Sequence, residues 1–254
     1  MGREFTIILL QNDWNVWAID NDQAALHDLK AELSSKSYSS RLNTDCIDVS
    51  DINALKAFCE NLKAQWQSLD LLINNAGVVF GGSIEKVPLE NHLKTIDVNL
   101  NGLIATTFLF LPLLQKSQQS ILIQMASVTG LMGLAYGTAY SASKWGVVGF
   151  SEALRNELKD KQQNHPHICI VCPSYIDTGM FSGTKHPMFM PTLESRKLAH
   201  KVLSAAQRRK FYVYEPMLVR FVSLLRSVLP VSAQDRLLRF LGVAPGMKQW
   251  RGRP

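Results

Sequence analysis

The chain has 254 residues, of which 46% are hydrophobic, and it carries 27 Lys and Arg against 21 Asp and Glu. A chain of this size can bury a large core unaided, which excludes the small scaffolds that depend on disulfides or metals. The four cysteines and six histidines are scattered, so neither a disulfide framework nor a metal site is expected. Composition therefore favours one soluble α/β domain in a reducing, cytoplasmic compartment.

Apolar strand-like runs alternate with helical patterns along the chain, which is typical of repeated βα units around a parallel sheet. We expect helices at 2–10, 23–33, 52–66 and 97–114, and strands at 16–20, 69–73, 121–125 and 168–172, with a further strand ending near Asp48. The helix at 97–114 is apolar. Its polar residues Asn99 and Asn101, its Pro112 and its place between strands argue against a membrane span.

Two cysteines, Cys169 and Cys172, lie in the strand expected at 168–172. Side chains three residues apart in a strand point to opposite faces of the sheet, so a redox pair or a zinc clamp is not expected there. We interpret both as buried core thiols.

A tyrosine and a lysine lie four residues apart, at Tyr140 and Lys144. In a helix they share one face, so the ammonium group can stand beside the phenol. Lowering the phenol pKa by about three units requires about 4 kcal/mol of phenolate stabilisation, and an adjacent cation can supply much of it. Taken alone, the same spacing also suits an ordinary solvated helix face.

Other polar residues follow the expected strands. Ser127 ends an apolar run thirteen residues before Tyr140, a position that equally suits a turn or a cap. The segment Asn74-Asn75-Ala76-Gly77 closes the strand at 69–73, and Asn99 begins the segment Asn99-Leu100-Asn101-Gly102.

These segments, together with Tyr140 and Lys144, resemble the classical short-chain dehydrogenase/reductase family, and the resemblance extends from Gly2 to about Pro216. It implies a three-layer α/β fold with a Rossmann-type, doubly wound parallel sheet. It also implies an NAD(P)-dependent oxidoreductase that transfers a hydride between a nicotinamide cofactor and an alcohol or ketone.

The resemblance assigns a role to each catalytic candidate. Tyr140 would be the general acid/base, and Ser127 would hydrogen-bond the substrate oxygen. Lys144 would lower the phenol pKa and hold the nicotinamide ribose, while Asn99 would anchor a water chain that returns the proton to solvent. These roles suit a titratable phenol, a hydroxyl, a cation and an amide.

Cofactor choice depends on Asp20, at the end of the strand 16–20. A carboxylate there accepts hydrogen bonds from the adenosine ribose and repels a 2′-phosphate, so we expect NAD, with NADP possible because Arg3 lies close by. Asp20 could equally cap the following helix. The resemblance implies further cofactor contacts at Gly2, Asp48, Val49, Asn75, Ala76, Gly77, Pro173 and Thr178, besides Tyr140 and Lys144. Ser174 departs from the family, which usually has glycine there.

The family's opening strand and glycine-rich turn do not precede Gly2, which matches the last glycine of that turn. We therefore expect the first strand of the sheet to be missing, and this strand normally lies in the middle. Three explanations are open: a natural start further upstream, a fragment of a longer protein, or a natural short form with impaired cofactor binding.

Apolar residues surround the catalytic candidates. Leu131, Met132 and Leu134 lie between Ser127 and Tyr140, and Met180, Phe181, Met188, Phe189 and Met190 follow Thr178. Flexible thioethers and rings suit an adaptable apolar pocket, which favours a lipid-, isoprenoid- or steroid-like substrate. The same residues would also suit lid packing or subunit contacts.

The expected catalytic helix is rich in small residues, namely Ser141, Ala142, Ser143, Gly146 and Gly149. They permit close approach by a cofactor or by the same helix of a second subunit, and tight packing within one subunit is the alternative. The family resemblance favours a homodimer or homotetramer.

Charge separates the chain into two parts. Residues 191–254 contain 13 Lys and Arg against 3 Asp and Glu, whereas residues 1–190 contain 14 against 18. We expect a dehydrogenase domain at 1–215 and a basic amphipathic extension at 216–254 that packs on it or continues it. Its helices are expected at 217–229 and, after a capping box of Ser232 and Asp235, up to Leu241.

A basic amphipathic extension can contact a membrane peripherally or cover a partner, or it can complete the substrate pocket or a subunit interface. Nucleic-acid binding is not expected. The alternative to an active oxidoreductase is therefore a catalytically impaired form that binds membranes or partners through this tail.

Overall fold

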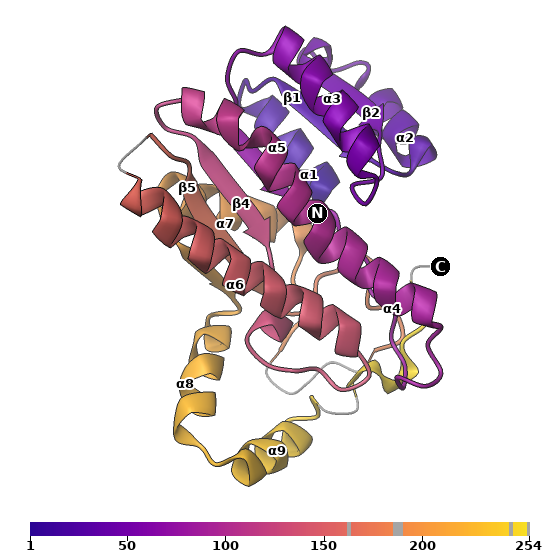
Figure 1. Ribbon diagram of the computed structural model, residues 1–254. Helices are drawn as coiled ribbons and strands as arrows, with labels where there is room; N and C mark the ends of the chain where they lie inside the picture. Colours follow the sequence, from indigo (N-terminus) through magenta and orange to yellow (C-terminus); the bar gives the residue numbers. More distant parts are fainter. Residues whose placement is uncertain (162–163, 185–189, 244–245, 253–254) are drawn as a thin grey trace.

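The computed structural model describes residues 1–161, 164–184, 190–243 and 246–252. Within these ranges the chain forms parallel strands flanked by helices, in the alternating order expected from the sequence (Figure 1). The fold is a Rossmann-like α/β fold, as predicted.

The first of two sheets contains β1 (Val16–Asp20) and β2 (Leu42–Cys46), which pair in parallel with Val16 opposite Leu42. Helix α2 (Gln23–Leu33) connects them. It begins where the Asp22 carboxylate accepts a hydrogen bond from Ala25 N, and its leucines at helical spacing are buried.

The second sheet has the order β3–β4–β5–β6, and all its neighbouring strands are parallel. Its strands are β3 (Leu71–Asn74), β4 (Ile121–Met125), β5 (His167–Pro173) and β6 (Tyr212–Glu215). Every residue of β4 is buried, because helices cover both faces of this sheet.

Side chains on successive strand positions enter opposite layers. Leu122 packs toward α3 (Ile52–Gln65), α5 (Gly102–Lys116) and α6 (Thr138–Asp160). Ile121 and Ile123 pack toward α1 (Gly2–Gln11) and α7 (Ser195–Gln207). Cys172 and Cys169 likewise join the two different clusters, which confirms that these thiols point to opposite faces.

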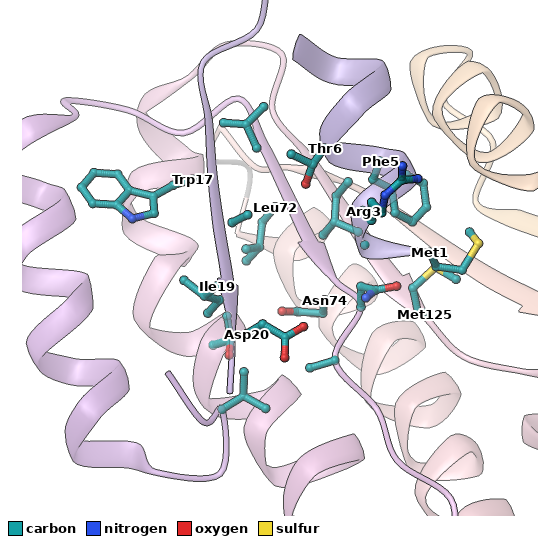
Figure 2. A pocket seen from close by; sticks show the side chains of 18 of the residues that line it. Met1, Arg3, Phe5, Thr6, Trp17, Ile19, Asp20, Leu72, Asn74 and Met125 are labelled. Atoms are coloured by element: carbon teal, nitrogen blue, oxygen red, sulfur yellow. The ribbon is translucent and has the colours of Figure 1, made fainter. Parts of the chain in front are cut away.

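Within the described residues no strand lies between β1 and β3, so the two sheets remain separate. A cavity of ≈1240 Å³ occupies this position and is bounded by Trp17 and Ile19 of β1 and by Leu72 of β3 (Figure 2). Helices flank it, with Phe5 of α1 and Phe110 of α5 in its wall. The space has the place and the apolar walls that a central strand requires.

One long helix lies in the helical layer that also contains α3 and α6. It consists of α4 (Leu89–Ile96), a π-helical turn (Asp97–Asn101) and α5. Among the described helices it alone is long and apolar enough to cross a membrane by length and composition, and 44% of its most apolar window is buried. Since α4 packs on α6 and α5 packs on α3 and β3, we interpret it as a core helix.

Two helices near the C-terminus extend away from the body, below α6 in the view of Figure 1. They are α8 (Phe221–Val228), preceded by a 3₁₀ turn (Met217–Arg220), and α9 (Val231–Phe240). Neither α8 nor α9 contains a fully buried residue. The predicted capping box is wrong, because α9 begins at Val231 after Pro230 and has no side-chain cap.

After α9 the chain returns to the body. Met247 is fully buried, and the Trp250 ring packs against Phe80 with 6.2 Å between centroids. Trp250 Nε1 donates a hydrogen bond to the Met180 carbonyl (2.9 Å).

Three elements were not predicted as separate units: α4, α7 and β6.

Candidate active site

Helix α6 brings Tyr140 and Lys144 together. Both side chains are buried, and Lys144 Nζ lies 5.7 Å from the centroid of the Tyr140 ring. Nζ donates a hydrogen bond to the Met125 carbonyl at the end of β4 (2.7 Å). The shared helix face expected from the spacing is therefore present, and the ammonium group is tied to the sheet.

Ser127 follows β4 directly and precedes a 3₁₀ turn (Val128–Gly130). Its Oγ accepts a hydrogen bond from Thr129 N (3.2 Å) and donates one to the Pro173 carbonyl (3.5 Å), and the same hydroxyl lowers the pKa of the Tyr140 phenol. The C-terminal end of the strand thus delivers a hydroxyl to the buried tyrosine, where parallel sheets of this kind bind their ligands.

The phenol does not have the lowered pKa that the spacing suggested. Burial raises the pKa of Tyr140 to about 12, although the Ser127 bond lowers it. Lys144 directs its Nζ to the Met125 carbonyl rather than to the phenol oxygen, and desolvation of the phenolate dominates. The acid at this site is protonated at neutral pH.

Lys144 should leave a pH signature in stability, because burial lowers the pKa of Lys144 from 10.5 to about 8. Between these values the unfolded lysine binds a proton that the folded lysine has released, so this group's contribution to stability rises with pH. We expect the free energy of unfolding of the parent, relative to Lys144→Met, to increase by about 1 kcal/mol per pH unit in this window. Urea unfolding across the window measures it, and a constant difference would contradict a depressed pKa.

Asn99 occupies the π-helical turn and is 1% exposed. Its Oδ1 accepts from Val78 N (2.7 Å), and its Nδ2 donates to the Val78 carbonyl (2.9 Å) and to Ser143 Oγ (3.1 Å). These bonds hold the loop after β3 against α6. A Cβ on Gly77 would lie 3.4 Å from Asn99 Oδ1 and 3.8 Å from Lys144 Nζ, so the three residues are adjacent.

Asp20 ends β1 at the rim of the large cavity (Figure 2). It does not cap the next helix, because that role belongs to Asp22; instead Asp20 Oδ1 accepts from Asp22 N (3.1 Å). The alternative interpretation of Asp20 as a helix cap is therefore wrong. Its exposed carboxylate faces a cavity large enough for a nucleoside.

Asp48 and Val49 line the same cavity. Burial favours the neutral form of Asp48, but hydrogen bonds from Ser50 and the charge of Lys94 outweigh it and hold the pKa of Asp48 below its usual value. Val49 is approached closely by Gly102, where a Cβ would lie 2.8 Å from the Val49 carbonyl oxygen. Only glycine allows this contact.

Arg3 does not offer a free cation to this cavity. Its Nε donates to Glu32 Oε2 (3.1 Å), and its guanidinium also pairs with Glu4. A 2′-phosphate would have to compete with both carboxylates.

The start of α1 lies against the loop after β3. A Cβ on Gly2 would be 3.0 Å from Asn75 Nδ2, and Gly2, Asn75, Ala76 and Gly77 all line the cavity. The first backbone N–H groups of a helix have no partner within the helix and favour an anion. This part of the site could therefore hold a pyrophosphate, although with fewer glycine amides than a complete turn would supply.

Pro173 ends β5, and Pro173, Ser174 and Thr178 line the cavity near Tyr140. Ser174 is buried and does not have a positive φ, so serine fits where the family usually has glycine. Its Oγ has no hydrogen-bond partner.

The side of the site where we expect the substrate to bind is apolar. Phe181 packs edge-on against Tyr140 (5.8 Å between centroids) and against Tyr175 (5.4 Å). A small cavity of ≈30 Å³ beside them is lined by Met132, Leu134 and Val243, among others. Leu131 is buried in the same cluster but does not line this cavity, and Met180 lines the larger one.

Residues from the C-terminal tail were missed by sequence reasoning. Val243 lines the small cavity, and Trp250 bonds the Met180 carbonyl. Tyr175 was missed too, although its position two residues after Pro173 could have indicated it. Met188 and Phe189 lie outside the described residues. Among the described residues, no group of His, Cys, Asp and Glu could hold a metal ion.

Comparison with known proteins agrees with this geometry. The family model described as short chain dehydrogenase matches residues 1–188. Epidermal retinol dehydrogenase 2 from Mus musculus is 30% identical over 232 residues, which are 91% of this chain and 73% of that protein.

Solved structures share the fold. A short-chain dehydrogenase/reductase from Burkholderia phymatum in complex with NAD superposes with a TM-score of 0.79 at 22% identity, covering 92% of this chain and 90% of that one. An alcohol dehydrogenase from Thermococcus sibiricus complexed with 5-hydroxy-NADP gives 0.72 at 20% identity, covering 83% and 89%. With the family model matching most of the sequence and the relative matching nearly all of it, the chain belongs to the short-chain dehydrogenase family of oxidoreductases.

Proposed function

We propose that the protein transfers a hydride between NAD and an apolar alcohol or ketone. The observation that carries this proposal is the buried cluster of Ser127, Tyr140 and Lys144 at the junction of the large cavity and the apolar side. Bound nicotinamide would supply the hydride acceptor or donor, and the chain would supply the proton and the positioning.

The proton chemistry belongs to Tyr140. The phenol donates its proton to the substrate oxygen during ketone reduction, and in the reverse direction the phenolate accepts the proton of the alcohol. Ser127, whose hydroxyl acts on the pKa of the phenol, would hold the same substrate oxygen in line. Lys144 would hold the nicotinamide ribose, and Asn99 would anchor the water chain to solvent from its place between Val78 and Ser143.

We propose NAD rather than NADP as the cofactor. Asp20 presents a carboxylate where the adenosine ribose would lie, and Arg3 is engaged by Glu32 and Glu4. Gly2, Asp48, Val49 and the loop Asn75 to Gly77 would line the remaining cofactor path, with Pro173 and Thr178 at the nicotinamide end.

Asp20→Ala should reduce the preference of the enzyme for NAD over NADP. In a chain extended ahead of Met1 by an apolar strand and a glycine-rich turn, the variant loses the acceptor for the ribose hydroxyls and the repulsion of a 2′-phosphate. We therefore expect the kcat/KM ratio of NAD to NADP to fall by about tenfold or more. Asp22→Ala is the matched control, because Asp22 caps α2 and should leave the ratio unchanged. A parent preference for NADP would contradict the assignment.

The small cavity has an apolar lining that includes Met132, Leu134 and Phe181, and the chemistry of this lining, rather than the cavity's volume, favours an apolar alcohol. The relative described above is named for retinol, a long isoprenoid alcohol, which supports a lipid-, isoprenoid- or steroid-like substrate. Oxidation of retinol, a sterol and short alcohols by the chain extended ahead of Met1 with an apolar strand and a glycine-rich turn, measured by chromatography of the products, tests this directly. Turnover confined to short polar alcohols would contradict it.

We further propose a homodimer or homotetramer. A Cβ on Gly149 of α6 would meet open space, so this glycine is free for a subunit contact. A Cβ on Gly146 would lie 2.6 Å from Leu100, so Gly146 serves packing within the subunit.

We place the protein in the cytoplasm, with peripheral membrane contact through the C-terminal tail. The comparisons give no support to the alternative of a catalytically silent binding protein.

A further inference from the structure

Residues 217–240, which we call the arm, leave a large apolar face uncovered. Six side chains along it have exposed fractions between 42% and 69%: Met217, Leu218, Phe221, Leu224, Leu225 and Val228. They recur at intervals of three and four and therefore share one face of the helix. A contiguous exposed apolar surface of this kind marks an interaction site.

The opposite side of α8 holds the arm on the catalytic body. Arg226 Nη1 donates a hydrogen bond to the Leu131 carbonyl (2.6 Å), and its guanidinium lies 4.5 Å from the centroid of the Trp145 ring. Val222, one turn earlier, packs against the main core cluster. One arginine thus contacts both the loop after Ser127 and the catalytic helix, at the residue next to Lys144.

Helix α9 fixes the arm's shape. Gln234 Nε2 donates to the carbonyls of Leu229 (2.7 Å) and Arg226 (3.1 Å), so the turn between the helices is bridged. The exposed face is consequently presented by a braced pair of helices.

The arm is also basic. It contains four arginines and one acidic residue, Asp235. Arg220, Arg236 and Arg239 are exposed. A helix that combines an apolar face with flanking arginines lies in the interface of an anionic membrane, with the apolar side chains among the acyl chains and the cations at the head groups.

We propose that the arm docks its apolar face on an anionic lipid surface, and that Arg226 transmits this docking to the loop after Ser127. This docking specifies the peripheral membrane contact proposed above. It can be tested by binding measurements that do not depend on catalytic turnover.

A second copy of the chain fits this face less well. A two-fold interface places the same patch on both sides, so the arginines of one arm would meet those of the other with a single aspartate each to compensate. An anionic lipid surface instead complements the exposed arginines Arg220, Arg236 and Arg239.

The position of the arm suits delivery of an apolar substrate. Val219, at its beginning, and Val243, just after its end, are buried in the same cluster as Met132 and Leu134. Val243 also lines the small cavity beside Tyr175 and Phe181. A docked arm would place the lipid phase next to the substrate side of the site.

Vesicle co-sedimentation tests the docking. We expect the protein to bind vesicles of phosphatidylcholine with phosphatidylserine, and to bind pure phosphatidylcholine at least about tenfold more weakly. Replacing Leu224 and Leu225 together by Asp should abolish binding, whereas Ile84→Asp, at a side chain that is 64% exposed on the body, should not. Melting curves show whether each variant is folded.

Two results would overturn the docking: absence of parent binding to the anionic vesicles, or equal binding by the Leu224/Leu225 variant. A change of oligomeric state in that variant without any vesicle binding by the parent would assign the face to a second copy, which also contradicts the proposal.

Hydrogen exchange tests the role of Arg226. In the parent, anionic vesicles should slow amide exchange in residues 128–135. Arg226→Ala should still bind the vesicles, because its apolar face is intact, but the slowing should be lost. Arg220→Ala is the control, since Arg220 stacks on Phe221 within the arm. Slowing that persists in Arg226→Ala would show that the arginine does not carry the coupling.

Discussion

Adding an apolar strand and a glycine-rich turn ahead of Met1 should stabilise the protein strongly and confer tight NADH binding. The added strand would lie in the cavity between β1 and β3 and pair with both, joining the two sheets. Each buried backbone group that gains a partner contributes on the order of 1–3 kcal/mol, against a total stability of only about 5–15 kcal/mol. A few such groups suffice for a large effect.

Thermal melts and calorimetric titration with NADH, applied to residues 1–254 and to the extended chain, measure both consequences. We expect a rise of at least about 10 °C in melting temperature, and weak or undetectable NADH binding by residues 1–254. An extended chain whose strand carries a central proline is the matched control, because proline removes a ladder donor. Equal melting temperatures and micromolar binding by residues 1–254 would mean that the open edges of β1 and β3 are not a weakness of the fold.

Much of the central sheet could be predicted because its signals are local. The strands Val16–Asp20 and Ile121–Met125 and the helix Gln23–Leu33 have the predicted bounds, and each shows a clear apolar period or a polar cap at its start. The closeness of Tyr140 and Lys144 could be predicted because residues four apart in a helix share one face, whereas Ser127 was joined to them through the family resemblance.

Contacts between distant segments could not be predicted in this way. Val243 lines the small cavity with Phe181, 62 residues earlier, and Trp250 bonds Met180, 70 residues earlier. No periodicity in the sequence indicates such contacts. The capping box predicted at Ser232 is wrong, because Pro230 occupies the N-cap position and α9 begins at Val231. A lowered pKa was predicted for Tyr140, but burial raises it. The spacing of Tyr140 and Lys144 does not indicate that the phenol is buried.

Tyr140→Phe should abolish turnover and leave cofactor binding nearly unchanged. The phenol oxygen carries the proton, while the ring carries the packing against Phe181, which phenylalanine preserves. Loss of a general acid lowers the rate by about a hundredfold to ten-thousandfold. Steady-state kinetics of the extended chain give kcat, and calorimetry gives the NADH affinity. Tyr175→Phe is the control, because Tyr175 packs on the same ring and has no proposed part in proton transfer.

Single-turnover reduction of an apolar ketone by the extended chain with bound NADH tests the central claim most directly, because loss of NADH absorbance reports hydride transfer itself. The parent and Tyr175→Phe should complete the turnover at similar rates, and Tyr140→Phe should be slower by about a hundredfold or more. If Tyr140→Phe transferred its hydride at a near-parental rate, Tyr140 would not be the acid, and the assignment of this buried cluster as the catalytic site would be wrong.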